Sequence, residues 1–166
     1  MSLSPQLSAE LNRLSGNPAA LPHTALLSAP DGVDVAVEFV AVDRLGCAFE
    51  QLRIRVPALA GCDTDKLTEW AEALSRRVTY LLEGLGPIEI DTQAGQVLVR
   101  SNPPDQQPAG TSYYEVRLQS DTGGNFSLRR FQAVKGAPGR TQVDVQLTHE
   151  VLLKLVDDLV DTIPAP

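Results

Sequence analysis

The sequence contains few of the residues on which disulfide frameworks and metal sites depend. Its 166 residues include two cysteines, Cys47 and Cys62, and two histidines, His23 and His149. Two cysteines are too few for a disulfide framework, and no HExxH, HxH or Cys/His ligand spacing occurs. We therefore expect no metal and no cofactor, and we interpret both cysteines as small hydrophobic side chains.

Long apolar runs are also absent. No stretch approaches the roughly 20 apolar residues that cross a bilayer, and the N-terminus lacks the basic patch and apolar run of a signal peptide. These absences predict a cytoplasmic protein with no membrane partner. Hydrophobic residues make up 43% of the chain and charged residues 21%, which is typical of a globular protein. The length predicts a single domain over residues 1–166.

Lysine is scarce, with three lysines beside eleven arginines, and we interpret this usage as that of a GC-rich bacterial genome. The net charge of −7 argues against a nucleic-acid partner, because phosphates are neutralised by cations. The cations are unevenly distributed, however. Segment 117–140 has a net charge of +4, with Asp121 as its one acid, so the remainder carries −11. The cations of this segment are Arg117, Arg129, Arg130, Lys135 and Arg140.

The first 32 residues predict little regular structure beyond one helix. Residues 1–16 form a short N-terminal helix whose apolar side chains recur at helical spacing. Residues 17–32 are a proline-rich connection with a brief strand at 24–28. The apolar stripe of the helix consists of Leu7, Leu11 and Leu14.

Residues 33–56 alternate between apolar and polar, which predicts a hairpin with its turn near residues 44–46. The pattern selects one register, because a slip of one residue would place Val35 opposite Arg55. In that register Ala41 faces Ala48, Val37 faces Leu52 and Val35 faces Ile54. Two features do not fit: Glu50 falls on the core face, and four apolar residues fall on the outer face. This outer group is Val40, Val42, Cys47 and Phe49, which either forms an interface between two copies or lies beneath the first helix.

The middle of the chain predicts a long helix and a second hairpin. The helix begins at Asp63 or Thr64 and runs for about five turns, until glycines and Pro87 stop it. The hairpin follows at residues 88–99. Residues 102–110 are polar and proline-rich, and we expect a mobile loop there.

Residues 113–147 predict further strands. With Leu118 opposite Phe126, one face of the sheet carries aromatic residues and arginines together, a mixture that is common in protein interfaces. The alternatives are that a helix covers this face, or that these residues form a solvated sheet surface with salt-bridged pairs. The residues of the face are Tyr113, Glu115, Arg117, Arg129 and Phe131.

The stretch KGAPGR at residues 135–140 combines two glycines with flanking cations, as phosphate-binding loops do. A phosphate loop, however, precedes a helix whose free N–H groups meet the anion. Here residues 141–147 alternate with period two, which predicts a strand. We therefore interpret KGAPGR as a turn.

A final helix begins after Thr148, and we expect Asp157, Asp158 and Asp161 on its solvated face. The predicted fold is α+β: an antiparallel sheet of six to seven strands, with two long amphipathic helices on one face and the short N-terminal helix. The order of elements resembles that of small acidic secretion chaperones, and also that of cavity-forming domains that wrap a sheet around a C-terminal helix. No residue motif carries the resemblance, and no family is assigned.

The sequence supports no specific enzyme, because no nucleophile, metal or nucleotide motif occurs. We expect a non-enzymatic, chaperone-like module that binds a protein partner or a second copy of itself. The alternative is a carrier or receptor for a small anion, which requires an enclosed pocket with an arginine as counter-ion. The residues expected to bind are Tyr113, Arg117, Arg129, Phe131 and Arg140, and those expected at an interface are Val40, Val42 and Phe49.

Overall fold

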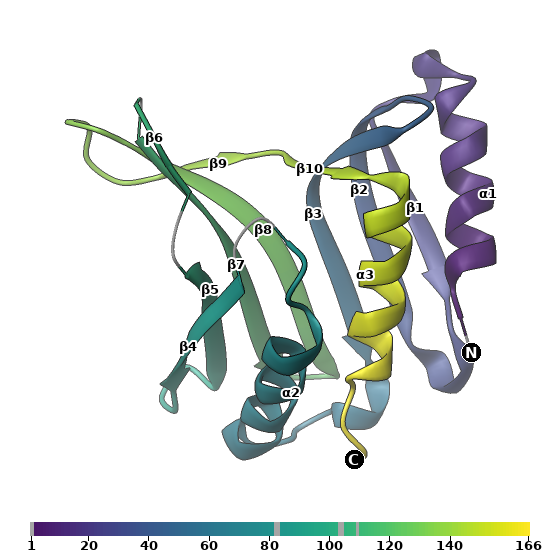
Figure 1. Cartoon of the computed structure of the whole chain (residues 1–166). Coiled ribbons are helices and arrows are strands. Elements are labelled where there is room, and N and C mark those ends of the chain that lie inside the picture. Colours follow the sequence, from purple (N-terminus) through teal and green to yellow (C-terminus); the bar gives the residue numbers. More distant parts are fainter. Residues whose placement is uncertain (1, 82–83, 103–104, 109) are drawn as a thin grey trace.

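Apolar residues at alternate strand positions build one face of a single antiparallel sheet, and helices cover that face (Figure 1). The computed structural model describes residues 2–81, 84–102, 105–108 and 110–166. Its helices are α1 (Ser4–Ser15), α2 (Thr64–Arg77) and α3 (His149–Asp161). Its strands are β1 (His23–Ser28), β2 (Asp34–Val42), β3 (Gly46–Val56), β4 (Gly84–Asp91), β5 (Gln96–Asn102), β6 (Asp105–Gln107), β7 (Gly110–Ser120), β8 (Gly124–Val134), β9 (Thr141–Val143) and β10 (Val145–Thr148).

The sheet follows the order β1-β2-β3-β8-β7-β5-β4, with β6 on β7, β9 on β8 and β10 on β3. The α+β class is therefore as predicted, but the described residues form ten strands rather than six to seven. Part of the expected loop 102–110 is the strand β6; residues 103, 104 and 109 of that loop lie outside the described residues. The segment 141–147 is divided into two strands with different neighbours.

The division of 141–147 has a structural cause. β3 and β8 pair only between Leu52–Val56 and Gly124–Leu128. Beyond that stretch β9 pairs with β8 and β10 pairs with β3, so the chain crosses from one half of the sheet to the other, as the yellow-green segment in Figure 1 shows. The Gln142 side chain donates a hydrogen bond to the Glu50 carbonyl at 2.9 Å and joins the two halves.

The predicted register of residues 113–134 is confirmed, and that of residues 33–56 is confirmed except for a shift around Phe39. Ala41 pairs with Ala48, Val37 with Leu52 and Val35 with Ile54. In the hairpin of β7 and β8, Leu118 pairs with Phe126, Glu115 with Arg129 and Tyr113 with Phe131. The KGAPGR turn is confirmed too, since residues 135–140 connect the antiparallel strands β8 and β9.

The expected outer position of Phe49 is wrong, and the reason is a bulge. The register between β2 and β3 shifts on either side of Phe39, so Glu50 becomes exposed and the alternation changes phase. Phe49 then faces the core with 0% of its surface exposed, in edge-to-face contact with Phe39. Cys47 and Val42 are buried as well, and Val40 is half-buried.

Helix α2 is shorter than the five turns expected, because it ends at Arg77. The chain then leaves the helical path, yet Val78 and Leu81 stay buried as the apolar pattern predicts. The Tyr80 hydroxyl donates a hydrogen bond to Asp158 at 2.6 Å, which holds this segment against α3.

The expectation that Asp157 and Asp158 lie on a solvated face is wrong. Asp158 is 5% exposed and binds Arg77, Tyr80 and Lys154. Asp157 accepts hydrogen bonds from the N-terminus, including the Leu3 amide at 2.9 Å. The acids of α3 therefore connect it to the helices or segments on either side.

The core lies between the helices and the inner face of the sheet. Trp70 of α2 stacks against Phe126 of β8 with ring centroids 5.9 Å apart. The hollow between α2, α3 and the sheet is an apolar space of about 10 Å³, too small for a ligand. Among the described helices, none combines the length and the apolar character needed to cross a membrane.

Candidate functional site

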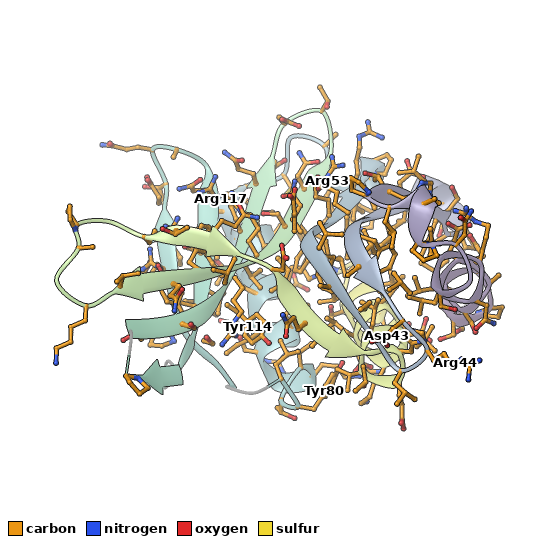
Figure 2. All side chains as sticks on the ribbon, turned by 90° about the horizontal axis from the view of Figure 1, so that it is seen from above. Asp43, Arg44, Arg53, Tyr80, Tyr114 and Arg117 are labelled. Carbon is orange, nitrogen blue, oxygen red and sulfur yellow. The ribbon has the colours of Figure 1, made fainter. Side chains whose placement is uncertain are left out.

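The outer face of the sheet, opposite α2 and α3, carries the residues that the sequence predicts to bind. Strand alternation places Tyr113, Arg117, Arg129 and Phe131 on this face. Figure 2 shows Arg53 and Arg117 on one side of the sheet and Tyr80, which contacts α3, on the other. Figure 1 shows α2 and α3 together on the inner side. The expected alternative, a helix over the outer face, does not occur among the described residues.

A buried carboxylate organises one part of this face. Glu115 is 2% exposed and lies in the middle of β7. Arg140 contacts it through both terminal nitrogens, at 2.5 and 3.4 Å. Arg100 from β5 donates to the same carboxylate at 3.4 Å and also to the exposed Glu89. We call Arg100, Tyr113, Glu115, Phe131 and Arg140 the outer-face cluster.

The cluster includes a stack of flat side chains. The Arg140 guanidinium lies 3.7 Å from the centre of the Phe131 ring, and the Phe131 and Tyr113 rings are 6.0 Å apart. Arg140 also donates to the Tyr113 hydroxyl at 3.2 Å. The end of the KGAPGR turn is therefore fixed to the sheet, and Phe131, which is 6% exposed, lies beneath an arginine.

Electrostatics favours the charged form of Glu115. Burial raises the pKa of this carboxyl, but Arg140 and Arg100 outweigh burial and hold it below its ordinary value. The same contact raises the pKa of Arg140. The pKa of Arg129 is lowered, by burial and then by the neighbouring charge of Arg117. Two cations therefore repel one another beside the cluster.

Next to the cluster is an open groove of about 500 Å³. It arises because two small residues, Ala36 and Ser127, lie in the same row across the sheet as two arginines. In this row Ala36 pairs with Arg53, Arg53 with Ser127 and Ser127 with Arg117. Long side chains flank short ones, which leaves a hollow. We call it the arginine groove, and its cations are Arg53, Arg55, Arg117 and Arg129.

The structure does not bring all predicted residues together. Arg117 and Arg129 line the groove, and Tyr113, Phe131 and Arg140 form the adjoining cluster. Arg130 lies on the inner face, with its guanidinium 4.3 Å from the centre of the Tyr114 ring. Of the residues expected at an interface, Phe49 is in the core. Val42 lines a separate open hollow near the exposed Leu45.

Sequence reasoning missed Arg53, Arg55 and Arg100. Each hairpin register was readable, but these residues meet Arg117, Arg129 and Glu115 only because β3 pairs with β8 and β5 pairs with β7. The available signal was that Arg53 and Arg55 already faced outward in the first hairpin.

Two observations concern the cysteine and metal chemistry of the described residues. Burial raises the pKa of Cys47 to about 12, which keeps the thiol neutral. No group of three His, Cys, Asp or Glu side chains that could hold a metal ion occurs in the described ranges. What the outer face offers is hydrogen-bond donors and positive charge, which suit the binding of oxyanions.

Comparison with protein-family models, with curated proteins and with solved structures gave no match.

Proposed function

We propose that this protein is a non-enzymatic binding module whose outer sheet face docks an acidic surface of a protein partner. The observation that carries the proposal is the concentration of arginines on a sheet face that α2 and α3 leave uncovered. They belong to a chain whose overall charge is −7. An acidic partner would meet complementary charge here and like charge over the rest of the surface.

The outer-face cluster supports this function because it is already ordered. Arg140 is held by Glu115 and stacked on Phe131, so a partner that contacts it would immobilise few additional side-chain torsions. Arginine and tyrosine are the residue types that dominate interface energetics when they are rigid. The stack of Tyr113, Phe131 and Arg140 contains both residue types, and its contacts hold the Arg140 side chain in place.

The second candidate, binding of a small anion, is favoured by the arginine groove. The sequence-based form of that hypothesis required an enclosed pocket, whereas the groove is open. An open groove suits an anionic group that projects from a partner as well as a free anion, so the two candidates share one surface.

The test is capture followed by reconstitution. The protein and two variants are used as bait in lysate of the source organism, captured proteins are identified, and each is purified and its affinity measured. One variant, Arg53→Glu with Arg129→Glu, reverses charge on the outer face. The control, Arg44→Glu with Arg76→Glu, makes the same change at exposed positions outside the groove.

A purified partner that binds the protein and the control equally, and the face variant at least tenfold more weakly, supports the proposal. Its affinity should also fall as salt increases. Equal affinity for all three forms would contradict the proposal. The proposal would also be contradicted if no captured protein binds the bait again after it has been purified.

A further inference from the structure

The arginine groove has a pronounced excess of positive charge. Four guanidiniums line it, from β3, β7 and β8, and the one carboxylate among the lining residues is Asp34. The lining therefore has a net charge of +3. Asp34 pairs across the strands with Arg55 but its carboxylate accepts from Ser28 at 3.3 Å.

Counter-ions in the described part of the chain compensate these cations only partly. Arg53 pairs with Glu38 at 3.2 Å on the rim. Arg117 approaches Glu115 at 4.0 Å, but that carboxylate already serves Arg100 and Arg140. Arg55 and Arg129 form no ion pair with any described residue. The groove therefore contains cations without matching anions.

The groove also contains a buried N–H donor that lacks a hydrogen-bond acceptor within the described ranges. The Arg117 Nε atom is buried and has no hydrogen-bond partner among the described residues. A buried donor left unpaired is destabilising. The pKa of Arg129 is lowered, first by burial and then by the neighbouring charge of Arg117. An oxyanion in the groove would relieve the repulsion and supply acceptors.

The chemistry of the donors limits what that anion is. Guanidinium presents paired N–H groups that match the oxygens of phosphate or carboxylate. A phosphate monoester carries about −1.5 to −2 near neutral pH, so two phosphates bring about −3 to −4 to this lining, whereas two carboxylates bring about −2. A volume of about 500 Å³ is within the usual range for small-ligand sites.

We propose that the arginine groove binds the phosphate groups of a ligand that carries two or more of them. This inference deepens the proposed function, on which it rests, by naming the anionic group that the outer face recognises. The phosphates belong either to a free small molecule or to a phosphorylated segment of the partner. Ser127 lies between Arg53 and Arg117 in the row across the sheet, and Arg55 and Arg129 lie further along β3 and β8.

The experiment is isothermal titration with sodium tripolyphosphate at fixed ionic strength, with citrate as a carboxylate comparison. It uses the protein, the variant Arg117→Gln with Arg129→Gln, and the control Arg44→Gln with Arg76→Gln. A second variant, Ser127→Phe, fills the groove without changing charge, and thermal unfolding verifies that each variant folds. A peptide with two phosphoserines and its unphosphorylated form identify the source of the phosphate.

We expect tripolyphosphate or the phosphopeptide to bind the protein and the control equally. The double glutamine variant should bind at least tenfold more weakly, and Ser127→Phe should bind more weakly as well. Whichever probe binds identifies the source. Absence of binding by both probes, equal binding of citrate, or equal affinity of the glutamine variant would overturn the inference. If citrate binds as tightly as tripolyphosphate, the phosphate inference fails and the acidic-partner proposal stands. If the partner binds the face variant as tightly as the protein but tripolyphosphate binds the groove, the acidic-partner proposal fails and the phosphate inference stands.

Discussion

At the scale of single residues, Glu115 determines how the outer face is arranged. Its carboxylate is buried, yet the arginines that neutralise it, Arg100 and Arg140, are partly exposed. A buried acid thus fixes cations at the surface, where a partner can reach them. The same arrangement links stability to pH.

We expect Glu115→Gln to lower the free energy of unfolding by about 1.5–3 kcal/mol at neutral pH, the usual range for hydrogen bonds to charged groups. The pKa of Glu115 is lower in the folded chain than the ordinary value of about 4.3. Its stabilisation is therefore present above that ordinary value and is lost as pH falls toward the folded pKa. Denaturant unfolding between pH 7 and pH 3 measures this.

The matched control is Glu50→Gln, at an exposed position on β3. It should change stability by less than about 0.5 kcal/mol at every pH. If the free energy of unfolding of Glu115→Gln falls between pH 7 and pH 3 as steeply as that of the unchanged protein, the assigned role of Glu115 is wrong.

Phe49 provides a second test at this scale, because the bulge moves it from a possible interface into the core. Phe49→Ala should lower the free energy of unfolding by about 3–5 kcal/mol, as for other buried phenylalanines. Leu45→Ala, at a position 80% exposed, should have little effect. Denaturant unfolding compares the two. A Phe49→Ala variant as stable as Leu45→Ala would place Phe49 at the surface.

At the scale of elements, local patterns predicted most of the fold. The hairpins of residues 33–56 and 113–134 had the expected registers because apolar alternation and turn position suffice to define them. The bulge near Glu50 was visible only as a conflict, an acid on the core face beside outward apolar residues. A change in the alternation of the strand removes this conflict, and no single residue in the sequence indicates where such a change occurs.

Longer-range features could not be derived in the same way. The pairing of β3 with β8 joins strands about 70 residues apart in sequence, and the segment after α2 contacts α3 through Tyr80 and Asp158. The predicted binding residues Tyr113, Arg117, Arg129, Phe131 and Arg140 came from a local hairpin and one turn. The groove needed Arg53 and Arg55 from the other half of the sheet, so half of its cations were missed.

The contact between α2 and α3 yields a prediction for Asp158. Burial raises the pKa of this acid, but Tyr80, Lys154 and Arg77 outweigh burial and lower it. Asp158→Asn should lower the free energy of unfolding by about 1–3 kcal/mol above pH 5, and this loss should diminish as pH falls through the folded pKa. Thermal unfolding at several pH values measures it.

Asp161→Asn is the comparison, since Asp161 is half exposed and pairs with the same Arg77. An exposed ion pair contributes at most about 1 kcal/mol. Equal losses for the two variants would show that Asp158 does not connect α3 to the segment after α2.

At the scale of the whole molecule, one chain presents two different surfaces. Helices fill the inner side of the sheet with a dense apolar core, and the described outer side carries the arginine groove and the outer-face cluster. The total charge is −7, so the positive groove is a local exception to an acidic surface. Such asymmetry steers an acidic partner toward one face and weakens with salt.

The most direct measurement is arginine footprinting by mass spectrometry. The protein is labelled with an arginine-specific reagent, alone and in complex with its reconstituted partner. We predict that Arg53, Arg117 and Arg129 lose reactivity in the complex while Arg44 and Arg76 keep theirs. Unchanged reactivity in the groove, with protection of Arg44 or Arg76 instead, would contradict the assignment of the outer sheet face as the binding surface.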